Sequence, residues 1–299
     1  MDTFFQYTVN GLTAGSFYAL VALGYTIIYG IIRLINFAHG DLTMVGAFVG
    51  WTVLVPFALN RLPVGVAIVL ALVIAMAFCS LVNLAILQFA YKPLLKKSML
   101  AIMITALGMS ILLQNSALLI FGSGVDAYPD LVSTAGFMVA NIRVTFAQAA
   151  FVLFSGLLML VLYLFVRYTT LGIAMRALAI DHEATRLMGI DVDRVIQIGF
   201  LLGAVLAAAS GVMIGLYYGQ ITYFLGFLIG LRAFTAAVLG GIGNIPGAMV
   251  GGVVIGLLES YCAGYLSGAW QDVFVFAVLI IVLIVRPTGI LGERVAERM

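Results

Sequence analysis

Charged side chains are scarce in this chain of 299 residues. Only 9% of the residues are Asp, Glu, Lys or Arg, whereas 64% are hydrophobic. Ordinary soluble domains are about a quarter charged and about half apolar. The few charges are also clustered, which leaves apolar runs of roughly 20 residues, enough for a helix to cross a bilayer. The composition therefore predicts a polytopic membrane protein with almost no soluble domain.

The residues of metal and nucleophile chemistry are also rare, with two histidines and two cysteines. Cys79 and Cys262 lie inside apolar runs, so we expect small hydrophobic side chains and no disulfide. Two histidines and scattered acids form no metal-ligand cluster, Ser–His–Asp set or carboxylate pair. We therefore expect no catalytic site, no metal, no cofactor and no nucleic-acid partner.

A nucleotide site is missing as well. The chain has no Gly-Lys dipeptide, which excludes the phosphate-binding loop G-x-x-x-x-G-K-[ST]. The glycine-rich stretch "GGIGNIPG" (240–247) lacks the strand, the helix and the distant acid of a dinucleotide site. It is typical of a tight break between two membrane helices. Any ATP hydrolysis that drives this protein must come from another subunit.

Nine apolar runs are candidate membrane helices. Helices are favoured because lipid offers the backbone no hydrogen-bond partners, and the runs are too long for barrel strands. We expect an all-α fold of about eight to nine transmembrane helices in one domain, 1–299. The weakest candidates are the second run and the pair formed by the seventh and eighth, either of which can include a re-entrant piece. The runs are 9–31, 41–59, 64–90, 99–121, 147–166, 195–217, 227–243, 247–266 and 271–286.

Lysine and arginine predict the orientation. Eleven of them occupy one set of alternate connections, and only Arg61 and Arg143 occupy the other. The positive-inside rule assigns the richer side to the cytoplasm. We therefore expect the N-terminus outside and the C-terminus in the cytoplasm. The eleven are Arg33, Lys92, Lys96, Lys97, Arg167, Arg176, Arg186, Arg194, Arg286, Arg294 and Arg298.

The longest cytoplasmic connection, 167–194, is unusually polar. Apolar residues from Ala177 to Met188 recur at helical spacing, which predicts one short amphipathic helix. Gly189 suits the end of that helix, and Asp191 suits the N-cap of the next span. Two interpretations stay open: a helix that lies in the membrane interface, and a helix that docks in a groove of a cytoplasmic partner.

Ionisable residues within spans are costly and point to function or to pairing, and Arg232 and Glu259 are the clear cases. If 227–243 and 247–266 form a hairpin, Arg232 and Glu259 reach the same depth within about 3 Å. We favour a structural ion pair over a transport site, because a lone buried charge is poorly tolerated.

Further polar residues lie near the start of the second run. Asn36, His39 and Asp41 occupy its cytoplasmic entry, where His39 and Asp41 are expected to cap the helix and anchor it at the interface. Asn36, His39, Asp41 and Asn115 are the candidate polar groups of a translocation pathway.

Several long stretches resemble one family. "EATRLMG" (183–189) occupies the position of the E-A-A…G cytoplasmic loop of ATP-binding-cassette importer permeases, with Thr185 in place of the second Ala. Residues 10–48, "NGLTAGSFYALVALGYTIIYGIIRLINFAHGDLTMVGAF", and 234–260, "FTAAVLGGIGNIPGAMVGGVVIGLLES", are similar to stretches of branched-chain amino acid permeases of the LivH type. "RPTGILG" (286–292) is similar to their C-terminal ending.

This resemblance implies a multi-pass permease subunit of the bacterial inner membrane that forms half of a pathway for leucine, isoleucine and valine. Its implied partners are a second permease chain, identical or homologous, two cytoplasmic ATPase subunits and an extracytoplasmic substrate-binding protein. The cytoplasmic loop would insert into the ATPase. Its implied contact residues are Glu183, Ala184, Arg186, Leu187, Met188 and Gly189.

Two alternatives stay open at this point. Related permeases carry urea, short amides or other amino acids. An ion-coupled secondary transporter would need buried acids that coordinate its ion, and only Glu259 and Asp272 qualify. A membrane enzyme would need clustered His, Asp or Glu at a membrane edge, which this sequence does not supply.

Overall fold

The computed structural model describes residues 2–57, 61–94, 99–132, 135–139 and 142–292. Lys96, Lys97, Arg294 and Arg298, four of the eleven residues behind the predicted orientation, lie outside these ranges. The helices are α1 (Asp2–Ile32), α2 (Ala38–Leu54), α3 (Val64–Ala85), η2 (Ile86–Tyr91), η3 (Lys92–Leu94), α4 (Met99–Phe121), α5 (Phe146–Tyr168), α6 (Thr170–Ile180), α7 (His182–Leu187), α8 (Val192–Tyr218), α9 (Leu225–Gly240), α10 (Ile245–Tyr265), η4 (Gly268–Trp270) and α11 (Gln271–Val285). The strands are β1 (Asp126–Ala127), β2 (Gly136–Val139), β3 (Ile142–Thr145) and β4 (Gln220–Ile221).

The prediction of an all-helical polytopic membrane protein is confirmed. Within the described residues, seven helices are long and apolar enough to cross a membrane. Each of the nine predicted runs overlaps a helix, but α2 and α9 have only 17 and 16 residues. The strands are short and form two antiparallel pairs, the local hairpin β2–β3 and the pair of β1 with the distant β4. They belong to connections and add no sheet layer to the bundle.

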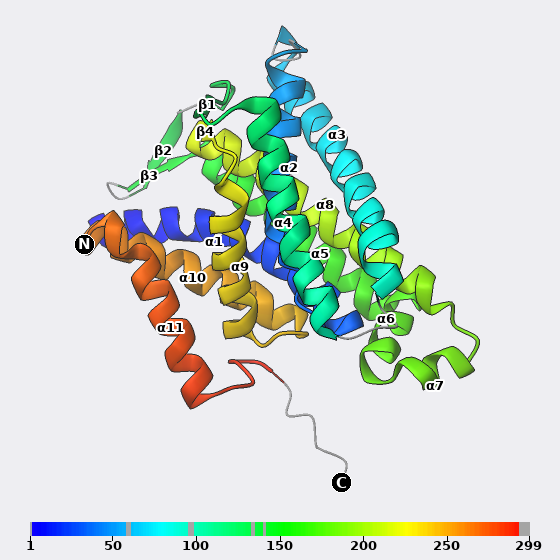
Figure 1. The fold of residues 1–299 in the computed structure, drawn as a ribbon. Coiled ribbons are helices and arrows are strands. Elements are labelled where there is room, and N and C mark those ends of the chain that lie inside the picture. Colours follow the sequence, from blue (N-terminus) through cyan, green and yellow to red (C-terminus); the bar gives the residue numbers. More distant parts are fainter. Residues whose placement is uncertain (1, 58–60, 95–98, 133–134, 140–141, 293–299) are drawn as a thin grey trace.

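The connections gather at two ends of the bundle (Figure 1). One, here called the α6–α7 end, holds the connections 33–37, 169–191 and 241–244 and the segment 286–292. There the guanidinium of Arg33 donates hydrogen bonds to the carbonyls of Ala179 and Ile180, and Lys92 forms an ion pair with Asp193 at 2.7 Å.

The other, here called the hairpin end, holds the connections 122–132, 219–224 and 266–270 and the β2–β3 hairpin. Trp51 at the end of α2 donates its ring N–H to the carbonyl of Ala127 at 2.9 Å. Tyr128 follows and inserts between α2 and α8, where its hydroxyl donates to the carbonyl of Ala47. The chain therefore passes from one end to the other in each of its long helices, and also in α2 and α9.

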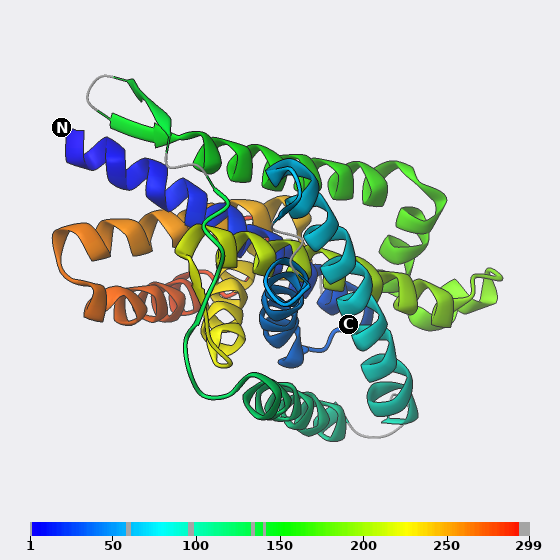
Figure 2. The ribbon, with the colours of Figure 1, turned by 90° about the horizontal axis from the view of Figure 1, so that it is seen from above.

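Helices α1 and α8 form the centre of the bundle. In their most apolar stretches, 83% of the residues of α1 and 78% of those of α8 are buried. In the span formed by η4 and α11, only 6% are buried. Helix α4 lies at the edge, as Figure 2 shows for the teal-green helix that stands apart from the others. The apolar side chains that α3, α4, α5 and α11 leave exposed form the surface that lipid or another chain would cover.

Glycines let the central helices touch backbone to backbone. A Cβ atom on Gly256 of α10 would lie 2.2 Å from the backbone nitrogen of Gly15 of α1. A Cβ atom on Gly40 of α2 would lie 2.5 Å from the Cα atom of Gly230 of α9. No side chain fits at such distances, so these glycines set how closely the helices pack.

The C-terminal stretch "RPTGILG" returns to the end of α9. The backbone N–H groups of Ile290 and Leu291 donate to the carbonyls of Leu239 and Gly240, at 2.8 and 3.0 Å. The last carbonyls of a helix have no partner within the helix itself. Asn244, the N-cap of α10, donates its side-chain N–H to the carbonyl of Leu291. The segment 286–292 therefore caps α9 and is tied to the start of α10.

Candidate functional sites

The polar connection 167–194 folds as two helices, α6 and α7, and the single amphipathic helix predicted from Ala177 to Met188 is wrong. Asp181 interrupts it with an extended backbone, φ −151° and ψ 118°. Its carboxylate accepts hydrogen bonds from the backbone N–H groups of Glu183 and Ala184, at 2.8 and 3.0 Å. An aspartate that bonds the next turn in this way begins a new helix instead of continuing the old one.

The predicted ends of the connection are confirmed. Gly189 follows α7 with φ +82°, a conformation that glycine adopts without strain. Asp191 is the N-cap of α8, and its carboxylate accepts from the backbone N–H of Arg194 at 3.2 Å. Helix α7 is thus held between two aspartate caps and a glycine turn.

Helix α7 and its C-cap present an exposed surface at the α6–α7 end. Leu187 and Met188 are 87% and 81% exposed, although both are large and apolar. Glu183, Ala184, Arg186 and Gly189 are exposed as well. Only Thr185, at 3% exposure, points inward, and its hydroxyl donates to the carbonyl of Asp181. The structure therefore brings the six predicted contact residues onto one projecting segment.

His182 begins α7 and lies near Arg33. Partial burial, together with the positive charge of Arg33, lowers the pKa of the His182 ring below its ordinary value. The shift favours the uncharged ring.

The two ionisable residues predicted to pair are in contact. The guanidinium of Arg232 on α9 lies 2.6 Å from Oε1 of Glu259 on α10. It also lies 2.8 Å from Asp272 on α11, and it donates to the hydroxyl of Tyr18 on α1 at 3.1 Å. The second carboxylate and the tyrosine were not predicted as partners. Asp272, in the first turn of α11, was the sequence signal for a second carboxylate partner. The packing of α11 against α9, however, cannot be predicted from residue spacing.

The polar residues at the start of α2 lie inside the bundle. Asn36, His39 and Asp41 are 4%, 0% and 1% exposed. The Oδ1 atom of Asn36 accepts from the backbone N–H of Ala38 at 3.1 Å and from the hydroxyl of Tyr91 at 2.7 Å. The prediction that His39 and Asp41 cap the helix and anchor it at the interface is wrong, because both lie within α2 and are covered by neighbouring helices.

Helix α4 reaches this cluster through a residue that the sequence analysis missed. The side-chain N–H of Gln114 donates to Oδ1 of Asp41 at 3.0 Å and to the hydroxyl of Ser110. Asn115, the predicted residue, is exposed and donates to the carbonyl of Ile111 in its own helix. One residue turns a helix position by about 100°, so neighbours face different sides. Both nitrogens of His39 and the Oδ2 atom of Asp41 have no hydrogen-bond partner among the described residues.

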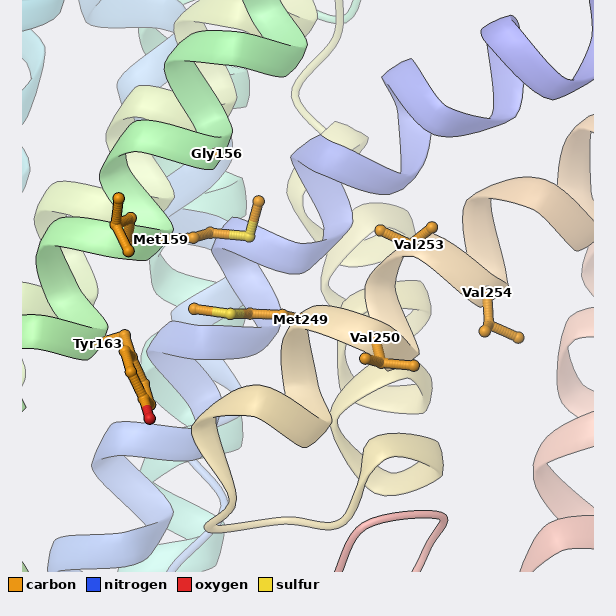
Figure 3. A pocket seen from close by; sticks show the side chains of 8 residues that line it. Gly156, Met159, Tyr163, Met249, Val250, Val253 and Val254 are labelled. Atoms are coloured by element: carbon orange, nitrogen blue, oxygen red, sulfur yellow. The ribbon is translucent and has the colours of Figure 1, made fainter. Parts of the chain in front are cut away.

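Two of the cavities on the surface of the described chain bear on function. The first, about 410 Å³, lies between α5 and α10, and Figure 3 shows Met159 and Met249 extending toward each other across it. Its walls are almost wholly apolar and hold no charged side chain among the lining residues, so it offers no ionic partner to a zwitterion. The second, about 360 Å³, lies at the hairpin end between α1, α8, α10 and α11, and Glu259 and Tyr218 contribute to its walls.

The described part of the chain holds no group of three or more His, Cys, Asp or Glu side chains that could bind a metal ion. What the geometry offers is a projecting segment at one end, buried polar and charged groups within the bundle, and a polar cavity at the other end.

Comparison with known proteins places these features in a family. The family described as branched-chain amino acid transport system / permease component matches residues 7–283. The high-affinity branched-chain amino acid transport system permease protein LivH of Escherichia coli K12 is 43% identical over 99% of this chain and 98% of its own. The protein BraD of Pseudomonas aeruginosa, described in the same words, is 41% identical over the same shares.

More distant proteins are similar too. A probable branched-chain amino acid transport permease protein LivH of Methanocaldococcus jannaschii is 30% identical over 91% of this chain and 88% of its own. A solved structure described as an inward-facing conformation of a putative metal-chelate type ABC transporter covers 93% of this chain and 85% of that chain, with 15% identity and a TM-score of 0.47. That last likeness carries no part of the assignment. From the family match and the near full-length relatives, this multi-pass membrane chain belongs to the family of permease components of branched-chain amino acid transport systems.

Proposed function

We propose that this chain forms half of the translocation pathway of an ATP-driven importer for leucine, isoleucine and valine in the bacterial inner membrane. Its family membership and the names of its relatives support this substrate class. The other half is a second permease chain, identical or homologous. Two cytoplasmic ATPase subunits supply the energy, and an extracytoplasmic binding protein delivers the substrate.

The projecting segment of α7 is the observation that carries the proposal. Leu187 and Met188 are exposed at the tip of a loop outside the membrane. Contact with a partner would be favourable, because it would remove their apolar surface from water. A short helix that presents such side chains fits a groove on a soluble protein. In this proposal the ATPase contacts are Glu183, Ala184, Arg186, Leu187, Met188 and Gly189.

The α6–α7 end is the cytoplasmic end in this proposal. Arg33, Lys92 and the arginines of 167–194 lie there, whereas Arg61 and Arg143 lie at the other end. This distribution is the one that the positive-inside rule assigns to the cytoplasm. Helices α2 and α9, at 1.5 Å per residue, span about 24–26 Å, close to the hydrocarbon thickness of a bilayer. Counting them gives nine crossings, with the N-terminus outside and the C-terminus inside.

The polar groups at the start of α2 contribute to the pathway in this proposal. Asn36, His39 and Asp41 provide acceptors and donors near the cytoplasmic end. Asp41 faces α4, whereas His39 lies against α1 and α8 and Asn36 bonds η2. An amino acid needs such groups for its charged end as it passes through the apolar bundle. Asn115 is exposed on α4, so only movement of α4 or a second permease chain would bring it to the pathway.

The docking role can be tested by purifying the transporter in mild detergent with a tag on this chain. Glu183→Lys and Leu187→Asp should remove most of the ATPase from the purified complex while leaving membrane insertion intact. Met138→Asp is the matched control, because Met138 is an exposed apolar residue (73%) at the hairpin end. If Glu183→Lys and Leu187→Asp retain the ATPase as well as Met138→Asp does, the docking role is wrong.

A further inference from the structure

The cavity at the hairpin end contains an acidic group that its own surroundings do not satisfy. Glu259 is 93% buried, being 7% exposed, and it lines this cavity of about 360 Å³. Its carboxylate is bonded to Arg232 through Oε1 and receives a hydrogen bond from Tyr18, but its Oε2 atom has no hydrogen-bond partner among the described residues. A buried carboxylate oxygen without a donor costs free energy, and rotation of the Glu259 side chain toward the cavity would let a donor from outside reach this oxygen.

The charge count beside the cavity points the same way. Arg232 brings one positive charge, while Glu259 and Asp272 bring one negative charge each. With all three ionised, the cluster has a net charge of −1. The rings of Tyr217 and Tyr218 also line the cavity. Aromatic faces attract cations, and a negative cluster beside them adds to that attraction.

The shape of the cavity limits the size of the cation. Small-molecule sites measure roughly 300–1,000 Å³, so this cavity is at the small end. The small side chains of Ala14 and Ala263 contribute to its walls and leave room for an apolar group. Among the described residues that line it, Glu259 is the only acid, which is too few oxygen ligands of this kind for a divalent metal ion.

We propose that this cavity is an entry site of the permease for the substrate, in which the carboxylate of Glu259 binds the α-ammonium group of a free amino acid. An ammonium group has three N–H donors, so it can donate to Oε2 and place a positive charge beside the negative cluster. The branched aliphatic side chain lies against the small residues and the tyrosine rings. The site lies at the hairpin end, where the binding protein releases its substrate in the proposed orientation. The inference thus rests on the proposed function and adds a substrate contact within the permease.

The test is equilibrium dialysis of radiolabelled leucine against the purified complex of permease chains and ATPase subunits in lipid nanodiscs, without binding protein. Leucine should bind, and 3-methylbutylamine, which is leucine without its carboxyl group, should displace it. 4-Methylpentanoate, which is leucine without its amino group, should not. Glu259→Gln removes the charge, and Ala263→Phe fills the cavity while leaving the three charged residues in place. Glu259→Gln should weaken leucine binding by about tenfold or more, the loss expected for one charge-assisted hydrogen bond. Ala263→Phe should weaken it at least as much, because the ring occupies the site.

Absence of leucine binding to the wild-type complex would overturn the proposal. So would wild-type affinity in Ala263→Phe, or displacement by 4-methylpentanoate as effective as that by 3-methylbutylamine. ATP-driven leucine uptake by the same complex, reconstituted in proteoliposomes with binding protein, separates the site from the proposed function. Uptake without ammonium-dependent binding overturns the site and leaves the function standing, whereas such binding without uptake supports the site and overturns the function.

Discussion

Replacing Arg232 with methionine should destabilise the protein more than replacing either of its acidic partners. Arg232→Met leaves the Glu259 carboxylate, whose side chain is 9% exposed, without its cation. Removing one partner of a buried ion pair costs about 3–5 kcal/mol. The flexible methionine fills much of the space of the arginine stem, so the loss reports mainly the charge and its hydrogen bonds.

The two acids should show smaller and unequal effects. Glu259→Gln leaves Arg232 bonded to Asp272 and Tyr18, so we expect a loss of about 1–3 kcal/mol, in the range for one hydrogen bond to a charged group. Asp272→Asn should cost about 0–1 kcal/mol, because the Asp272 side chain is 46% exposed and water screens the contact. Arg232→Met combined with Glu259→Met should recover part of the loss, because it leaves no uncompensated charge deep in the bundle.

The assay is equilibrium unfolding of the purified chain in detergent micelles with a rising fraction of dodecyl sulfate, followed by circular dichroism. The expected order of stability is wild type, Asp272→Asn, Glu259→Gln and Arg232→Met, with the double variant above Arg232→Met. Equal losses for Asp272→Asn and Arg232→Met would refute the reasoning. A double variant no more stable than Arg232→Met alone would do so too.

Three further predictions concern local structure. Asp181→Ala removes the cap of α7 and should cost about 1 kcal/mol locally, seen as faster amide hydrogen exchange at 182–187; unchanged exchange would contradict it. Gly40→Leu forces a side chain into the backbone of α9 and should cost at least about 1–3 kcal/mol, whereas Gly108→Leu, with nothing within 4 Å of its Cβ position, should melt like the wild type. Tyr128→Ala empties the space between α2 and α8 and should cost about 3–5 kcal/mol, while Tyr128→Phe should lose only about 1 kcal/mol; equal melting temperatures for these two variants would argue against the insertion of this ring.

Much of the helical organisation could be predicted, because backbone groups in lipid must form their hydrogen bonds within the span. A long apolar run in the sequence therefore indicates a helix. The contact of Arg232 with Glu259 was also predictable, because the rise of a helix is fixed and depth follows from residue count. Gly189 and Asp191 were placed correctly for a similar reason: their conformational and hydrogen-bonding preferences are local.

The predictions that proved wrong depend on competing local hydrogen bonds or on the rotation of a helix about its axis. The apolar pattern across Ala177–Met188 continues through Asp181, but the hydrogen bonds of its carboxylate end one helix and begin the next. Asn115 and Gln114 are adjacent, and only the packing of α4 decides which of them meets Asp41. The burial of His39 likewise comes from the close approach of neighbouring helices, which charge and hydropathy do not reveal.

ATP-dependent uptake in proteoliposomes tests the central claim most directly. The vesicles would contain this chain, its permease partner and the ATPase subunits, with ATP on the ATPase side and leucine-loaded binding protein on the other. The account predicts leucine accumulation only when both ATP and binding protein are present, and none with a proton or sodium gradient in place of ATP. Uptake of urea but not leucine under the same conditions would keep the energy source and change the substrate. Leucine uptake driven by an ion gradient alone would contradict the account.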